Sequence, residues 1–119
     1  MPLLTIDGYG TFDVPDGKRL VLAIEDTGYD NLHRCGGFAK CTTCRVHFLS
    51  GEPDQMTVAE RDRLIENGVM GQFRLSCQCL VTHDMAVHPL MRLSTSGLDD
   101  SGPHPESTIT PEPEWTTKP

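Results

Sequence analysis

The stretch Cys35-Gly-Gly-Phe-Ala-Lys-Cys41-Thr-Thr-Cys44 decides the interpretation of this sequence, together with the shorter stretch Arg74-Leu-Ser-Cys77-Gln. Three thiols lie within ten residues, and the fourth follows 33 positions after Cys44. One glycine-containing loop can direct several thiolates at a common point, and a distant segment can add one more. The pattern therefore predicts a metal–sulfur centre with Cys35, Cys41, Cys44 and Cys77 as its ligands.

Other thiol chemistries are weighed against this one. Cys41-Thr-Thr-Cys44 alone is a common pattern that zinc knuckles and thiol–disulfide exchange sites share. Structural zinc sites usually pair two such knuckles, and thioredoxin-like sites place the motif between a strand and a helix. A Rieske site needs two histidine ligands, and only Cys44-Arg-Val-His47 has part of that spacing. The spacing favours a [2Fe–2S] cluster, with zinc and dithiol redox chemistry as the alternatives.

A cluster held by four thiolates has a formal charge of minus two, which becomes minus three on one-electron reduction. Such a charge requires N–H donors directed at the sulfurs, and Gly36 and Gly37 allow the close backbone approach that this needs. Arg34, Lys40 and Arg45 flank the loop. They either neutralise part of the charge or are simply solvated.

Length and composition describe one domain of modest hydrophobicity, with 119 residues and 37% apolar residues. No apolar run is long enough to span a membrane, and the N-terminal residues lack the pattern of a signal peptide. Five cysteines without a secretory signal indicate a reducing compartment, so we expect a cytoplasmic protein. The net charge of −7 makes a nucleic-acid partner unexpected and favours an electropositive protein partner.

Local patterns predict the elements up to the cysteine loop. Residues 3–6 and 11–14 read as a hairpin, and Asp16 as the N-cap of a helix that ends at Gly28. Leu20, Val21 and Ile24 form the apolar stripe of that helix.

After the loop, residues 45–49 read as a strand. Thr57-Val-Ala-Glu60 is a capping box that opens a helix to about residue 67, with Leu64 and Ile65 expected to face inward. Residues 73–80 are predicted to form one strand carrying Cys77 and Cys79 on the same face, and residues 85–88 a last short strand.

The composition changes after residue 93. Residues 94–119 are rich in Ser, Thr, Pro and acids, and five carboxylates against one lysine give a net charge of −4. We expect a [2Fe–2S] domain over residues 1–93 and a flexible acidic tail over residues 94–119.

The cysteine loop and the segment around Cys77 resemble the [2Fe–2S] ferredoxins. The five-residue gap between Cys35 and Cys41 is similar to that of the adrenodoxin and bacterial iron–sulfur-assembly branch. The resemblance spans about residues 3–92. It implies an α+β protein with the β-grasp (ubiquitin-like) fold, in which a helix crosses a mixed sheet. It also implies a one-electron carrier, not an enzyme, with the four cysteines as ligands in order.

The resemblance also implies partners. These are a pyridine-nucleotide-dependent ferredoxin reductase and an acceptor such as an oxygenase or cytochrome P450, which dock transiently on a monomer. The interval from Cys44 to Cys77 is a few residues shorter than in adrenodoxin, and the acidic docking helix of that family is diluted here. The candidate docking residues are Asp54, Glu60, Asp62 and Glu66, interrupted by Arg61 and Arg63. The alternative functions are a redox-sensing or iron–sulfur-assembly accessory module and a zinc-stabilised interaction domain.

Two sets of residues are expected to stand apart from the cluster. Cys79 is predicted to be a buried free thiol, because unligated cysteine packs as a small hydrophobic side chain. The five histidines are scattered, and each is expected to lie on the surface or to pack against neighbours: His33, His47, His83, His88 and His104.

Overall fold

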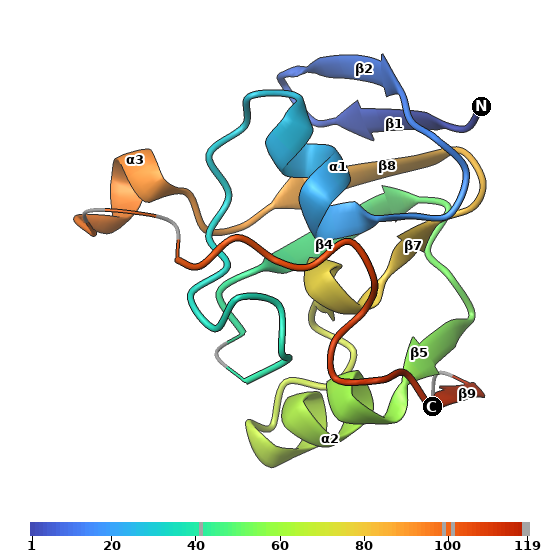
Figure 1. Ribbon diagram of the computed structural model, residues 1–119, viewed down its shortest axis with the longest axis vertical. Coiled ribbons are helices and arrows are strands. Elements are labelled where there is room, and N and C mark those ends of the chain that lie inside the picture. The colour runs from blue at the N-terminus through green and yellow to red at the C-terminus, as the bar shows by residue number, and fades with distance from the viewer. Residues whose placement is uncertain (41, 99, 101, 118–119) are drawn as a thin grey trace.

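The computed structural model describes residues 1–40, 42–98, 100 and 102–117. A five-stranded mixed sheet, in the order β2-β1-β8-β4-β6, forms the framework (Figure 1). The strands β1 (Leu3–Ile6) and β2 (Gly10–Asp13) are the predicted hairpin. The strand β8 (Met85–Pro89) runs parallel to β1 and antiparallel to β4 (Arg45–Ser50), which pairs with β6 (Arg74–Leu75).

The helix α1 (Leu20–Asp26) crosses this sheet and buries its apolar stripe against it (Figure 1). Leu20, Ala23 and Ile24 share a hydrophobic core with strand residues such as Ile6 and Val87. Burial of each large side chain in such a core contributes about 1.5–3 kcal/mol. A mixed sheet crossed by a helix is the architecture that the sequence predicts.

The predicted start of α1 is wrong. Residues 18–19 form a short strand, β3 (Lys18–Arg19), which pairs with β7 (Leu80–Val81), and the N-cap is Arg19 instead of Asp16. The N–H of Gly17 donates to Val81 and that of Leu20 to Cys79. These groups therefore bond across to a distant segment before the first helical turn begins.

The helix α2 (Val58–Glu66) follows β5 (Gln55–Thr57) as the capping pattern predicts. The Thr57 hydroxyl accepts from the backbone N–H of Glu60 at 3.1 Å. Leu64 is buried as expected, but Ile65 is 57% exposed, so its predicted inward orientation is wrong. With Leu64 already facing the core, the next residue along a helix turns by about 100° toward solvent.

The predicted strand over residues 73–80 is also wrong. The chain forms β6, then one turn of 3₁₀ helix, η1 (Ser76–Gln78), and then β7. Cys77 lies on this turn and Cys79 after it, so the two thiols do not share a strand face. Apolar periodicity does not reveal the turn, because both flanking pieces are strands of two residues.

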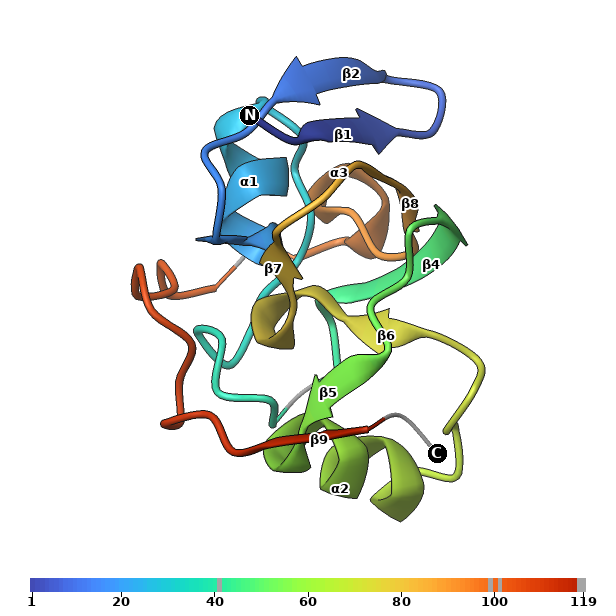
Figure 2. The ribbon, with the colours of Figure 1, turned by 90° about the vertical axis from the view of Figure 1, so that its right-hand side faces the viewer.

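The C-terminal segment follows the helix α3 (Leu93–Ser96) and runs along the domain past α1 and η1 (Figure 1). It ends in the strand β9 (Trp115–Thr117), which pairs antiparallel with β5 beside α2 (Figure 2). Pro105 and Ile109 are buried. The mobility of residues 94–119 stays a prediction, as does the boundary at residue 93. Across the described part of the chain, no helix has the length and apolarity to cross a membrane.

Candidate metal centre

The cysteine loop has several residues in left-handed backbone conformations, and most of these residues are buried. Gly36 and Gly37 have φ of 71° and 90°, and the non-glycine residues Ala39 and Thr42 have φ of 59° and 57°. Left-handed conformations at non-glycine residues are uncommon, and they often occur at ligand sites. The loop is thus folded tightly in the region that the sequence assigns to the cluster.

Three of the four predicted ligands lie in the described part of the chain. Cys44 and Cys77 are buried and Cys35 is partly buried, whereas Cys41 lies outside the described residues. A hydrogen bond with Cys44 lowers the pKa of Cys77, although its burial acts in the opposite direction. Cys35 also acts on Cys77 electrostatically. Cys44 and Cys77 are therefore neighbours, and Cys35 lies near enough to act on Cys77 electrostatically.

Hydrogen-bond donors reach two of these sulfurs. The backbone N–H of Lys40 donates to Cys35 Sγ at 3.4 Å, and the side-chain amide of Gln78 lies 3.6 Å from Cys77 Sγ. The positive φ that suits Gly36 and Gly37 to a close backbone approach is observed, and the N–H of Gly36 bonds to the carbonyl of His33 at 2.9 Å. Donors directed at sulfur are what a negatively charged cluster requires.

The four-thiol site thus includes one residue beyond those described. Among the described residues alone, no three side chains of His, Cys, Asp or Glu are arranged to hold a metal ion. The Cys44–Cys77 contact, the left-handed loop and the donors to sulfur nevertheless suit a cluster bound by thiolates. Cys35, Cys41, Cys44 and Cys77 remain the predicted ligands.

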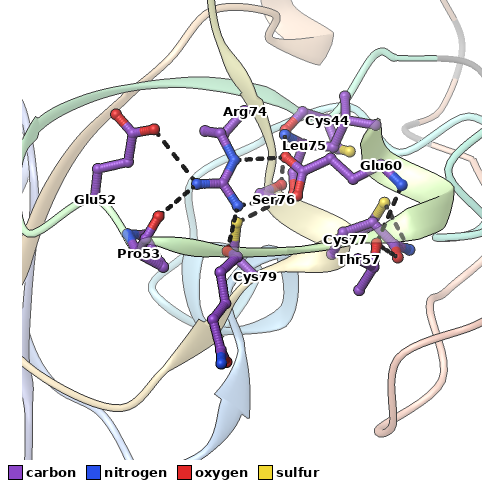
Figure 3. Close-up of polar contacts among 12 residues, drawn as sticks. Cys44, Glu52, Pro53, Thr57, Glu60, Arg74, Leu75, Ser76, Cys77 and Cys79 are labelled. Carbon is purple, nitrogen blue, oxygen red and sulfur yellow. Dashed lines mark hydrogen bonds and ion pairs between the residues drawn. The ribbon is translucent and has the colours of Figure 1, made fainter. Parts of the chain in front are cut away.

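A buried ion pair holds the segment before Cys77 (Figure 3). Arg74 Nε and Nη2 donate to the two oxygens of Glu60 at 2.8 and 3.0 Å, and Glu60 also accepts from the N–H of Leu75 at 2.8 Å. Glu60 is completely buried and Arg74 is 4% exposed. The prediction that Glu60 belongs to an acidic docking surface is therefore wrong. Its carboxylate connects α2 to the Cys77 segment.

A second link joins this segment to the cysteine loop. The N–H and the hydroxyl of Ser76 both donate to the carbonyl of Cys44, at 3.1 and 2.7 Å. Arg63 of α2 also donates to the carbonyl of Ala39 at 3.1 Å. Three elements distant in sequence are thereby fixed around the thiols.

The remaining acidic residues near α2 are exposed but partly paired. Asp62 contacts Arg61 at 3.2 Å and Glu66 contacts Arg63 at 3.4 Å. Asp54 is exposed as well. The surface around α2 thus carries both signs of charge.

The cations expected to flank the cluster are mostly engaged elsewhere. Arg34 is 40% exposed and pairs with Asp100 at 3.0 Å, and Lys40 is exposed. Arg45 bonds to Thr42 and lies over the ring of Phe73, 4.4 Å from its centroid.

Sequence reasoning missed Arg19, the buried cation nearest the site. Arg19 is 0% exposed and donates to the carbonyl of Cys77 through Nε at 3.1 Å and Nη2 at 2.7 Å. Its burial lowers its pKa, while the thiols of Cys77, Cys44 and Cys35 act in the opposite direction. The sequence feature that could have indicated its burial is its position immediately before the apolar stripe of α1.

Cys79 and the histidines lie where the sequence predicts. Cys79 is 2% exposed, and its thiol lies 3.5 Å from the carbonyl of Leu75. Burial, followed by the charge of Glu60, raises the pKa of Cys79 well above its ordinary value. His33 is buried against Glu25, and the other four histidines are exposed.

The sequence of residues 4–82 matches the family model described as the 2Fe-2S iron-sulfur cluster binding domain. The chain belongs to this family. A [2Fe–2S] cluster is therefore its cofactor, which confirms the prediction made from the cysteine spacing. The match ends in the connection between β7 and β8, so the C-terminal segment lies outside the matched residues.

The sequence of this [2Fe–2S] domain is also similar to those of known proteins. Rhodocoxin of Rhodococcus erythropolis is 35% identical over 79 residues, which cover 61% of this chain and 74% of rhodocoxin. One component of the Na(+)-translocating NADH-quinone reductase of Methylococcus capsulatus is 32% identical over 83 residues. Those residues cover 70% of this chain but 20% of that component, so the chain spans about a fifth of that relative's length.

A solved structure confirms the fold and agrees with the predicted branch of ferredoxins. The crystal structure of the ISC-like [2Fe-2S] ferredoxin FdxB from Pseudomonas putida is 28% identical and superposes with a TM-score of 0.59. The similarity covers 74% of this chain and 91% of the ferredoxin. The β-grasp prediction is thus confirmed.

Proposed function

We propose that the protein is a one-electron carrier in which Cys35, Cys41, Cys44 and Cys77 hold the [2Fe–2S] cluster. The observation that supports this best is the contact between Cys44 and Cys77, where the left-handed loop meets η1, with N–H donors directed at the sulfurs of Cys35 and Cys77. When bound, the cluster supplies reversible one-electron chemistry without transfer of a proton or a chemical group. In this proposal the chain is a carrier and not an enzyme.

The residues around the thiols have the functions that a carrier needs. The N–H of Lys40 and the amide of Gln78 are donors to sulfur, and they favour added negative charge. The Glu60–Arg74 pair and Ser76 hold the Cys77 segment in place. A rigid surround lowers the reorganisation that accompanies a change of charge.

The proposed partners are a pyridine-nucleotide-dependent ferredoxin reductase and an acceptor enzyme in the cytoplasm. Small, charged and transient contacts of a monomer suit rapid exchange of partners. The exposed residues Asp54, Asp62 and Glu66 are the acidic part of the proposed docking surface. Because Arg61 and Arg63 lie among them, electrostatic attraction should be modest and should weaken with salt.

Spectroscopy of cysteine variants tests the proposal. The protein should show visible charge-transfer absorption, and an electron paramagnetic resonance signal after one-electron reduction. Cys35→Ser, Cys41→Ser, Cys44→Ser and Cys77→Ser should each lose or strongly alter that absorption, whereas the matched control Cys79→Ser should retain it. A colourless zinc-containing protein, or loss of colour in the Cys79 variant alone, would contradict the ligand assignment.

A role in iron–sulfur assembly is the second candidate, and the likeness to an ISC-like ferredoxin favours it. Reduction by a reductase and turnover of an acceptor enzyme would support the carrier. Redox-dependent binding to assembly proteins, without such turnover, would instead support the accessory role.

A further inference from the structure

Arg19 is a buried cation with no carboxylate partner among the residues that the structure describes. Within that part of the chain its hydrogen-bond acceptors are backbone carbonyls, and no carboxylate lies within salt-bridge distance of it. A buried charge is costly unless it is paired or coordinates a metal. Since Arg is not deprotonated in proteins, this charge stays in the interior, where backbone carbonyls solvate it and a nearby anion would stabilise it further.

The acceptors of Arg19 come from three separate parts of the chain. Its guanidinium bonds to Cys77 of η1, to Gly37 of the cysteine loop, and to Glu106 and Thr108 of the C-terminal segment, at 2.7–3.1 Å. Two of these carbonyls belong to the predicted cluster-binding segments. Burial opposes the charge of Arg19, whereas the thiols of Cys77, Cys44 and Cys35, followed by the carboxylate of Glu106, favour it electrostatically.

Gly37 makes this close approach possible. Its φ is 90°, and a β-carbon there would lie 2.6 Å from Arg19 Nη2 and 3.1 Å from the β-carbon of Pro105. The carbonyl of Gly37 also accepts from Gln78 and Thr110, at 3.3 and 3.2 Å. The cysteine loop is therefore packed against both Arg19 and the C-terminal segment.

We propose that Arg19 is the buried counter-ion of the [2Fe–2S] cluster, and that the C-terminal segment completes the site that holds it. The inference rests on the proposed function. Arg19 acts as a positioning residue: it bonds to the carbonyl of Cys77 and places a positive charge beside the ligand segments. Because one-electron reduction adds a negative charge, a fixed cation favours the reduced form and raises the reduction potential.

Matched arginine variants test the charge. Two unit charges about 10 Å apart at an effective dielectric constant of about 20 change an equilibrium roughly tenfold. Arg19→Gln should therefore shift reduction toward the oxidised form by about tenfold, which equals about 59 mV for a one-electron couple. The matched control Arg34→Gln should shift it less, because Arg34 is exposed and paired with Asp100. Arg19→Lys, which keeps the charge but not the forked geometry, should fall between Arg19→Gln and the wild type.

Each result of the redox titration either supports or overturns the proposal that Arg19 is the counter-ion of the cluster. Equal potentials in Arg19→Gln and Arg34→Gln would overturn the proposal. If Arg19→Gln takes up no cluster but Arg19→Lys does, the shared charge is what the cluster requires and the proposal stands. If neither takes up a cluster while Arg34→Gln does, geometry and not charge is responsible, and the proposal fails. A wild-type protein without a [2Fe–2S] spectrum would instead refute the proposed function.

The contribution of the C-terminal segment has its own test. Ile109 is 6% exposed, between Thr108 and Thr110, which contact Arg19 and Gly37, whereas Ile65 on α2 is 57% exposed. In the full-length protein, Ile109→Ser should speed hydrogen exchange of the amides of residues 105–110. It should also speed cluster loss to an iron chelator at least threefold, which corresponds to a decrease of about 0.6 kcal/mol in the activation free energy of that loss. Ile65→Ser should change neither. Faster exchange without faster cluster loss would show that the segment does not complete the site.

Discussion

The buried ion pair between Glu60 and Arg74 should contribute strongly to stability, and Glu60→Gln tests this with little change of shape. Glu60 is completely buried and accepts three N–H groups within 3.0 Å. A neutral amide leaves Arg74 buried with a weaker partner, and breaking such a pair typically costs about 3–5 kcal/mol. Arg74 keeps the Glu52 carboxylate at 3.4 Å and the carbonyls of Pro53 and Gln55 as partners. We therefore expect the lower end of that range, about 3 kcal/mol.

The assay is thermal unfolding of the cluster-containing protein under anaerobic conditions, followed by circular dichroism and visible absorbance. A loss of about 3 kcal/mol should lower Tm by roughly 12 °C in a chain of this size. The control Asp62→Asn removes an exposed carboxylate from the same helix and should cost about 0.5 kcal/mol or less. A Glu60→Gln loss below about 1 kcal/mol, similar to that of the control, would refute the reasoning.

Two further predictions concern other parts of the fold. Partial burial opposes ionisation of Asp30, yet hydrogen bonds from a backbone N–H and from Arg92 hold the pKa of Asp30 below its usual value. A depressed carboxyl pKa contributes stability that is lost as the pH falls below about 4, so Asp30→Asn should flatten that loss in acid unfolding curves; an unchanged acid limb would exclude the effect. Gly51 has φ of 73°, and a β-carbon there would lie 2.4 Å from the backbone oxygen of Asp84. Gly51→Ala should therefore cost about 2 kcal/mol or more in urea unfolding, and more than Gly68→Ala, where the space is open; equal losses would contradict the steric argument.

The elements that local patterns define were predictable. The hairpin of residues 3–13, the apolar stripe of α1 and the Thr57 cap of α2 each depend on neighbours within a few positions. Hydrophobic alternation, helical spacing and capping chemistry operate at that range. The mixed sheet and its crossing helix were implied by the resemblance of the cysteine pattern to the [2Fe–2S] ferredoxins, not by these local patterns.

Three of the errors share a physical cause, which is pairing with a distant segment. The start of α1 moved because residues 17–20 bond to residues 79–81, and the strand predicted over residues 73–80 is interrupted by the turn that carries Cys77. Glu60 appeared to be a surface acid because its partner Arg74 is 14 positions away. A single sequence contains no signal that specifies such long-range pairs.

The amino-acid sequence by itself determined the chemistry of this protein. Four thiols at these spacings favour an iron–sulfur cofactor over zinc or dithiol chemistry, because ligand type and loop reach are local properties of the chain. Only the tertiary structure decided what surrounds them. It buried Arg19 between Cys77, Gly37 and the C-terminal segment, and it placed Glu60 inside instead of on the surface. Burial and charge pairing depend on which distant segments meet, and that is a property of the folded chain alone.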